Sequence, residues 1–334
     1  MFIVERNGLR RATAMLAALL CAFFGVLLSS CSAIDDIMGS GSTLSSEVPA
    51  DSEERANPGN PRDNTPQVLA TEQPGTAVNG TDRALLDFSN AANGYVCVQS
   101  YLGDTKVKVL VKSPGATKES QYTITSGGSY INVPLTTGDG TYTVTVYEHL
   151  YDDQYTPILT QDVSVQLVDE RAPFLYPNQI VKFADGDATV QLSEQVTENA
   201  TSEVEAVNQI YMYVVQNFSY DYDKANSVVP GYLPNNDDML ASGMGICYDF
   251  ASLSASMLRA QRLPTKLDVG YCGQAYHAWI EVYTVEQGWI RKKIEFAGGT
   301  WVRLDPTFDS AGNGAGDISM IIGDGKNYQP IFYY

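Results

Sequence analysis

The sequence predicts an α+β protein in which a small all-β sandwich precedes a mixed C-terminal domain. Three observations lead to this prediction. Residues 85–170 alternate apolar and polar side chains, residues 171–334 show a helical pattern followed by strand-like runs, and a polar stretch precedes both regions. With 334 residues, the chain is long enough for two domains of ordinary size and a tail.

The net charge excludes one class of partner. The chain holds 39 Asp and Glu against 21 Lys and Arg, a formal net charge of -18. Nucleic-acid phosphates need a basic surface, so we expect no nucleic-acid partner. The same balance argues against a polybasic attachment to anionic lipid.

Residues 1–30 have the pattern of a secretory signal peptide. Three arginines near the start precede an almost uninterrupted apolar run from Ala12 to Leu28. The run ends in Leu28-Ser29-Ser30-Cys31, which resembles the lipobox of bacterial lipoproteins. This resemblance implies cleavage before Cys31 and lipid on its sulfur, which would hold the protein at the extracytoplasmic face of the cell membrane. Ordinary secretory cleavage and a retained membrane helix are the alternatives.

Residues 31–84 predict a disordered tether. They are rich in Ser, Gly, Pro, Asn, Asp and Thr and poor in large apolar side chains. Such a segment buries too little apolar surface to offset the entropy lost on ordering. We expect it to separate the folded domains from the membrane.

Residues 85–170 predict an immunoglobulin-like sandwich of short antiparallel strands. Period-two alternation occurs at Val107–Val111, Tyr142–Val146 and Val163–Leu167, which is typical of half-buried strands. Turn-forming clusters of Gly, Pro and Ser separate the runs. The sandwich could be a spacer, a packing partner for the next domain or a ligand-binding module.

Residues 171–334 predict helices first and strands afterwards. Apolar side chains at helical spacing run from Val204 to Phe218, and Ser202 with Glu205 could form a capping box at the start of that helix. A second helix is predicted to begin close to Cys247. The strand-like runs are 266–272, 276–283, 289–296 and 300–304. This order favours an antiparallel sheet packed against a helix that bears a nucleophile.

Cys247 is the candidate nucleophile. Apart from Cys31, three cysteines remain beyond the signal peptide, Cys97, Cys247 and Cys272, so at least one cannot pair within the chain. Cys247 follows a glycine-rich turn and opens a predicted helix, whose positive end favours thiolate, although Asp249 opposes this effect. A Cys247–Cys272 disulfide is the alternative.

The candidate partners of the thiol are His277 and Asp305. The chain has two histidines, and His277 lies at the start of a predicted strand, whereas His149 follows a strand in the sandwich. Asp305 lies at a strand end fixed by Pro306. In a triad, Cys247 attacks an acyl carbon, His277 transfers the proton and Asp305 orients the imidazole.

The backbone N–H of Cys247 is a candidate oxyanion donor. Gln274 and Tyr213 are weaker guesses for a second donor. The chain offers too few ligands at metal spacing to predict a zinc site, so we expect neither a metal nor a cofactor.

Three ordered motifs resemble the transglutaminase-like superfamily. They are Gly245–Ala251 (Gly-Ile-Cys-Tyr-Asp-Phe-Ala), His277–Val282 (His-Ala-Trp-Ile-Glu-Val) and Asp305–Thr307 (Asp-Pro-Thr). The resemblance covers roughly 175–310. It implies a papain-like α+β core, acyl transfer through a thioester, and Cys247, His277 and Asp305 as the triad. No acidic cluster resembles the calcium sites of animal transglutaminases, and residues 287–299 form a hairpin-like insertion.

We therefore expect a membrane-anchored enzyme that acts on an amide or peptide carbonyl of a protein or peptide substrate. Hydrolysis of the thioester by water is slightly favoured over transfer to an amine. A catalytically silent binding or scaffold protein of the cell envelope is the alternative, and a third possibility is an adhesion protein whose sandwich makes the contacts.

Overall fold

The computed structural model describes residues 61–124, 127–290 and 328–334, all of which belong to one compact unit. The predicted signal peptide, Cys31, most of the predicted tether and Asp305 lie outside the described residues. Among the residues described, no helix combines the length and the apolar character that crossing a membrane requires.

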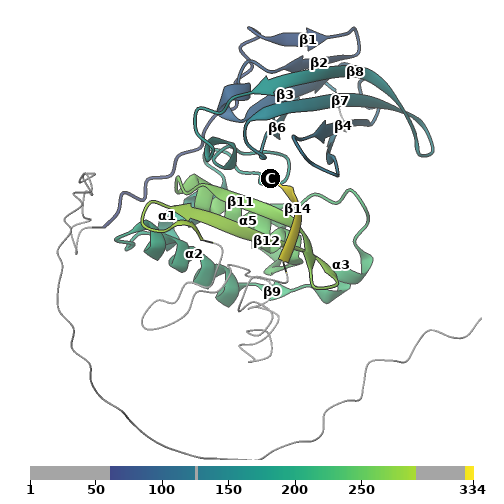
Figure 1. Cartoon of the computed structure of the whole chain (residues 1–334). Coiled ribbons are helices and arrows are strands. Elements are labelled where there is room, and N and C mark those ends of the chain that lie inside the picture. The colour runs from purple at the N-terminus through teal and green to yellow at the C-terminus, as the bar shows by residue number, and fades with distance from the viewer. Residues whose placement is uncertain (1–60, 125–126, 291–327) are drawn as a thin grey trace, which may run out of the picture. The chain divides into compact units, whose positions relative to one another are not determined.

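The N-terminal part is a sandwich of two four-stranded antiparallel sheets, as predicted (Figure 1). One sheet has the order β1 (Val78–Gly80), β2 (Ala84–Asp87), β3 (Tyr95–Ser100), β6 (Tyr130–Pro134); the other has β5 (Ser120–Ile124), β4 (Val107–Lys112), β7 (Gly140–Tyr151), β8 (Gln154–Val165). The alternating valines of β4, Val107, Val109 and Val111, are all buried. The period-two pattern thus marks the inward face of the sheet.

The connections are those of an immunoglobulin-like fold. The chain passes from one sheet to the other after β3, β5 and β6. Near the start of β7, the hydroxyl of Tyr142 donates to the carbonyl of Gly138 at 2.8 Å and accepts from the N–H of Thr137 at 2.9 Å. This is the tyrosine corner typical of such sandwiches.

The predicted tether ends earlier than residue 84. β1 and part of β2 lie within it, and its residues already bond to distant parts of the chain. The N–H of Arg62 donates to the carbonyl of Ala200 at 2.7 Å, and that of Gln67 donates to Ala260 at 2.8 Å. Composition alone missed this order because a polar segment can be held by backbone hydrogen bonds to a preformed surface.

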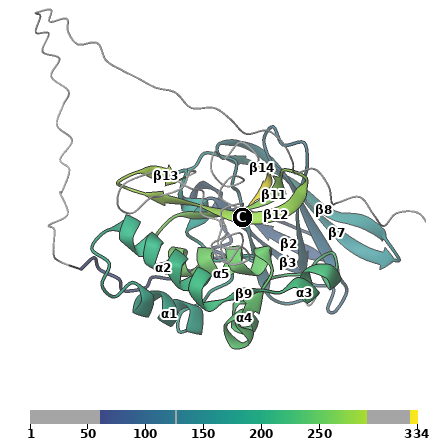
Figure 2. The same cartoon turned by 90° about the horizontal axis from the view of Figure 1, so that it is seen from below.

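The C-terminal part is an antiparallel sheet covered by helices, in agreement with the predicted α+β class. The strand order is β13 (Gly288–Ile290), β12 (Ala275–Thr284), β11 (Thr265–Cys272), β14 (Tyr328–Tyr333). The helices α1 (Ala188–Val196), α2 (Glu203–Asn217), α4 (Asn236–Ser242) and α5 (Cys247–Ala260) lie on one side of it (Figure 2). α5 packs directly on β11 and β12 and is buried over most of its length.

The helix start predicted at Ser202 is confirmed, but the capping box forms only in part. The Ser202 hydroxyl accepts from the N–H of Glu205 at 3.1 Å, as expected for an N-cap. The Glu205 carboxylate instead accepts from the N–H and hydroxyl of Thr201 at 2.8 and 2.7 Å.

The strands predicted at 266–272 and 276–283 are confirmed by β11 and β12. The run predicted at 289–296 is described only as far as Ile290, and that at 300–304 lies outside the described residues. The sequence did not predict α1, α3 (Tyr222–Ser227), α4 or β14.

Candidate active site

Cys247 is the first residue of α5, as predicted. The preceding residue, Ile246, has extended backbone, and its N–H donates to the carboxylate of Asp249 at 2.9 Å. The first N–H groups of a helix have no partner within it, which makes that end of the helix partly positive. The partly exposed thiol of Cys247 lies at this end of the 14-residue α5. None of the three cysteines in the described part of the chain is in a disulfide, so the structure does not adopt the Cys247–Cys272 alternative.

A short parallel pair of strands fixes the approach to Cys247. β9 (Ser219–Tyr220) pairs with β10 (Met244–Gly245), and the N–H of Asp221 donates to the carbonyl of Gly245 at 2.9 Å. A Cβ at Gly245 would lie 2.8 Å from the Cβ of Asp249, so only glycine fits there. The glycine before the cysteine thus allows the chain to turn tightly into α5.

The negative charge of Asp249, which the sequence suggested would oppose a thiolate, is compensated. This carboxylate is 1% exposed and accepts from the Lys224 ammonium at 2.7 Å and from the Tyr232 hydroxyl. Burial, together with the hydrogen bond to Asp249, raises the pKa of Tyr232 to about 12. Burial alone would lower the pKa of Lys224, but its bonds to Asp249 and Tyr232 raise it overall.

His277 lies in β12, opposite Gly270 of β11, and is 7% exposed. Its ring is nearly parallel to that of Trp279, with ring centroids 6.4 Å apart and an interplanar angle of 22°. The strand that carries His277 also packs directly against the helix that begins with Cys247.

Cys247 and His277 line the same cavity, which has a volume of about 590 Å³. The structure thus brings together two of the three predicted triad residues, while Asp305 lies outside the described residues. Of the candidate second oxyanion donors, Gln274 is exposed in the turn between β11 and β12, and Tyr213 packs against Phe218 with ring centroids 6.2 Å apart. Neither lines the cavity.

Sequence reasoning missed most of the other groups around this cavity. They come from the loop after α3, from β5 of the sandwich, from β14 and from the flanks of Cys247. Six of them are aromatic: Tyr220, Tyr232, Tyr248, Tyr276, Phe332 and Tyr334. No local signal in the sequence indicates this set, because its members meet only through tertiary packing.

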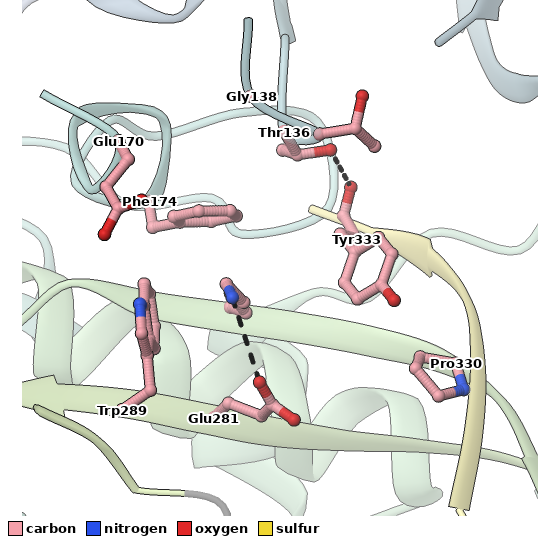
Figure 3. A pocket seen from close by; sticks show the side chains of 10 residues that line it. Thr136, Gly138, Glu170, Phe174, Glu281, Trp289, Pro330 and Tyr333 are labelled. Atoms are coloured by element: carbon pink, nitrogen blue, oxygen red, sulfur yellow. Dashed lines mark hydrogen bonds and ion pairs between the residues drawn. The ribbon is translucent and has the colours of Figure 1, made fainter. Parts of the chain in front are cut away.

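A second cavity, of about 710 Å³, has a different character (Figure 3). Lys266 and Glu281, which pair across β11 and β12, line it together with Phe174 and Trp289. The Lys266 ammonium lies 3.8 Å from the Trp289 ring centroid and 3.9 Å from the Glu281 carboxylate. Among the described residues, neither a cysteine nor a histidine lines this cavity, so the candidate chemistry belongs to the first one.

Over residues 61–124, 127–290 and 328–334, no three His, Cys, Asp or Glu side chains gather into a group that could hold a metal ion.

Comparison with known proteins finds a family model that matches this region. The Transglutaminase-like superfamily model matches residues 190–306. The uncharacterized protein YebA of Bacillus subtilis (strain 168) is 22% identical over 176 residues, which is 45% of this chain and 22% of that protein. This chain thus matches about a fifth of the length of that relative.

Two solved structures resemble the chain more distantly. A protein of Cytophaga hutchinsonii, described as a candidate cysteine protease, has 15% identity and a TM-score of 0.37, over 72% of this chain and 79% of that one. The transglutaminase of red sea bream has 13% identity and a TM-score of 0.25, over 66% and 49%. Both scores are too low to assign a shared overall fold.

Proposed function

We propose, from the match of residues 190–306 to the Transglutaminase-like superfamily model, that the chain is an acyl-transfer enzyme with Cys247 as its nucleophile. The observation that carries the proposal is the shared cavity. A thiol at a helix N-terminus and the only histidine of the C-terminal part line one hollow beside a sheet. The substrate is a protein or peptide that presents an amide carbonyl.

The proposed reaction passes through a thioester. The Cys247 sulfur attacks the amide carbon, the C–N bond breaks, and the departing nitrogen takes the proton that His277 received from the thiol. Backbone N–H groups at the start of α5 stabilise the oxyanion. Asp305 is proposed to orient the imidazole and to stabilise its charged form. Water or an amine then displaces the sulfur, gives up its proton to His277, and the thiol is restored.

Hydrolysis is our preferred outcome for the thioester, and one experiment separates it from transfer. The protein is incubated with a glutamine-rich protein and dansyl-cadaverine. New peptide ends or free carboxylates indicate hydrolysis, whereas incorporated fluorophore indicates transfer. Both should be lost in Cys247→Ala. Turnover that survives this substitution would contradict the assignment of the nucleophile.

Selective alkylation tests the thiol itself. We expect iodoacetamide at pH 8 to label Cys247 much faster than Cys97, as measured by mass mapping of peptides. Burial raises the pKa of the Cys97 thiol from 9.0 to about 11, so its thiolate fraction at pH 8 is roughly 100-fold below that of an ordinary thiol. Equal labelling of both cysteines, together with an absence of turnover, would instead indicate a catalytically silent binding protein.

The proposed location is the extracytoplasmic face of the membrane, through lipid on Cys31. We expect Cys31→Ala to move the protein from the membrane fraction to the soluble fraction, because the two acyl chains would no longer be attached. Cell fractionation followed by immunoblotting measures this, with Cys97→Ala as the matched control. Unchanged membrane retention of Cys31→Ala would contradict the lipid anchor.

A further inference from the structure

We infer that the cavity beside Cys247 selects acyl donors by an uncharged, apolar side chain next to the reacting carbonyl, aromatic or branched aliphatic. This inference rests on the proposed function, since it assigns the cavity to the substrate of Cys247. It names the substrate class, which neither the motifs nor the family model specifies.

The first observation is that no acidic, lysine or arginine side chain lies among the described residues of the cavity wall. Across the whole chain, 18% of the residues are Asp, Glu, Lys or Arg, so this part of the wall departs from the average composition. A charged substrate side chain would lose its hydration there and meet no oppositely charged Asp, Glu, Lys or Arg among these residues, which disfavours its binding.

Apart from Cys247 and His277, several polar groups of the wall are neutral or already occupied. Burial raises the pKa of Tyr248 and of Tyr276, so both phenols are uncharged at neutral pH. The Gln179 amide accepts from the N–H of Thr123 at 3.0 Å and donates to the carbonyl of the same residue. The Tyr232 hydroxyl donates to Asp249, so it is directed away from a substrate charge.

The second observation is a group of exposed apolar side chains at the cavity. Val228, Val229 and Leu233, in the loop between α3 and α4, are 39%, 69% and 38% exposed, and Tyr276 is 59% exposed. All four line the cavity. Apolar side chains that remain exposed and adjacent to one another mark a binding surface rather than a core. The loop would cover the bound side chain, and the tyrosine rings would stack against it.

The size of the cavity agrees with this assignment. A volume of about 590 Å³ falls within the range of sites for small ligands and exceeds what a single methyl or hydroxyl group would need. Large apolar side chains gain most from such a site, because the gain grows with the apolar area removed from water.

The test uses four cysteine-directed peptidyl acyloxymethyl ketones that differ only in the side chain next to the ketone: Leu, Phe, Lys or Glu. The rate of alkylation of Cys247 is measured for each on the full chain by intact-mass spectrometry and peptide mapping. We expect the Leu and Phe reagents to react at least roughly tenfold faster than the Lys and Glu reagents. Equal rates, or faster reaction of a charged reagent, would overturn the inference.

Val229→Asp probes the loop, with Val285→Asp as the matched control. Both side chains are strongly exposed, at 69% and 73%, so neither substitution threatens the fold, but only Val229 lines the cavity. We expect Val229→Asp to slow the Leu and Phe reagents severalfold and to speed the Lys reagent, while Val285→Asp changes none of them. The same response from both variants would contradict a role for the loop.

Iodoacetamide separates this inference from the proposed function, because a reagent this small does not need the cavity. If it labels Cys247 selectively while the four ketones show no preference, the inference fails and the proposed function stands. If it does not label Cys247 selectively, the proposed function fails and the inference fails with it.

Discussion

At the scale of single residues, the carboxylate of Asp249 holds the start of α5, the helix that begins with Cys247. It binds the N–H of Ile246, the ammonium of Lys224 and the hydroxyl of Tyr232. The Lys224 side chain is 28% exposed, whereas that of Asp249 is 1% exposed. The charge of Asp249 therefore depends on Lys224 for compensation.

We expect Lys224→Met to lower the free energy of unfolding by about 3 kcal/mol, because it leaves a buried carboxylate without its cation. Urea denaturation measures the change. Adding Asp249→Asn to this variant should recover part of the loss, since the buried charge is then removed. The matched control is Asp169→Asn, which breaks a half-exposed pair with Arg171 and should cost less than about 1 kcal/mol. Equal losses in Lys224→Met and Asp169→Asn would contradict the buried network.

The difference in free energy of unfolding between the wild type and Lys224→Met should depend on pH, because the pKa of Lys224 is raised. A group whose pKa is raised by folding contributes stability below its ordinary pKa, here 10.5, and loses that contribution as the pH rises through the folded value. The difference between the wild type and Lys224→Met should therefore be constant from pH 7 to about pH 10 and shrink above 10.5. A difference that shrinks between pH 7 and 9 would contradict the assignment to Lys224.

Local motifs indicated the candidate catalytic residues but not the groups that surround them. Cys247 and His277 could be found because each lies within a short pattern tied to helix or strand geometry. Lys224 and Tyr232 precede Asp249 by 25 and 17 residues and reach it only through the fold. Asp249 itself was recognised as a nearby charge, but its partners depend on tertiary packing, which no spacing rule gives.

At the scale of elements, the close approach of β14 to β11 depends on a glycine. Gly270 lies opposite Pro330, at a register shift after Val269. A Cβ at Gly270 would lie 2.1 Å from the carbonyl oxygen of Gln329, so no side chain fits between the two strands. On its other side, Gly270 pairs with His277. Gly270 of β11 therefore contacts both β14 and the strand position of His277.

We expect Gly270→Ala to lower the free energy of unfolding by about 2 to 3 kcal/mol and to slow alkylation of Cys247, because β14 or β11 must shift to admit the methyl group. Thermal melting and iodoacetamide kinetics measure the two effects. The control is Tyr271→Ala in the neighbouring, exposed position of the same strand. A stable Gly270→Ala protein with wild-type kinetics would show that the strands can separate at this point without consequence.

The elements that the sequence predicted are those with a clear period. The sandwich strands and α2 each bury one regular stripe, so alternation or helical spacing revealed them. β14 carries Pro330 and lies at the edge of its sheet, where proline is tolerated, and its short run has little alternation. α3 has no buried residue, so it has no apolar stripe to reveal it.

At the scale of the whole molecule, the predicted boundary at 170/171 does not divide the core. Buried side chains of the sandwich and of the C-terminal part belong to one continuous hydrophobic cluster. Tyr122 of β5 is 1% exposed and meets Tyr334 edge to face, with ring centroids 5.9 Å apart. Gln121 and Thr123, beside it, line the cavity of Cys247. Sequence patterns indicate where a strand is buried but not which partner covers it, so this continuity could not be predicted.

The continuous core predicts that the sandwich and the C-terminal part unfold together. All three tryptophans, Trp279, Trp289 and Trp301, belong to the C-terminal part, so their fluorescence reports on that part alone. Val144→Ala, deep in the sandwich, removes two buried methyl groups and should cost roughly 2 kcal/mol. If the unit unfolds cooperatively, the free energy of unfolding obtained from tryptophan fluorescence in urea falls by this amount. The fluorescence transition then coincides with the transition seen by circular dichroism. Thr141→Ala, at an exposed position of the same strand, should leave both transitions unchanged. If Val144→Ala leaves the tryptophan fluorescence transition unchanged, the sandwich and the C-terminal part unfold as two independent domains. The sandwich would then not be needed to hold the cavity of Cys247 in place.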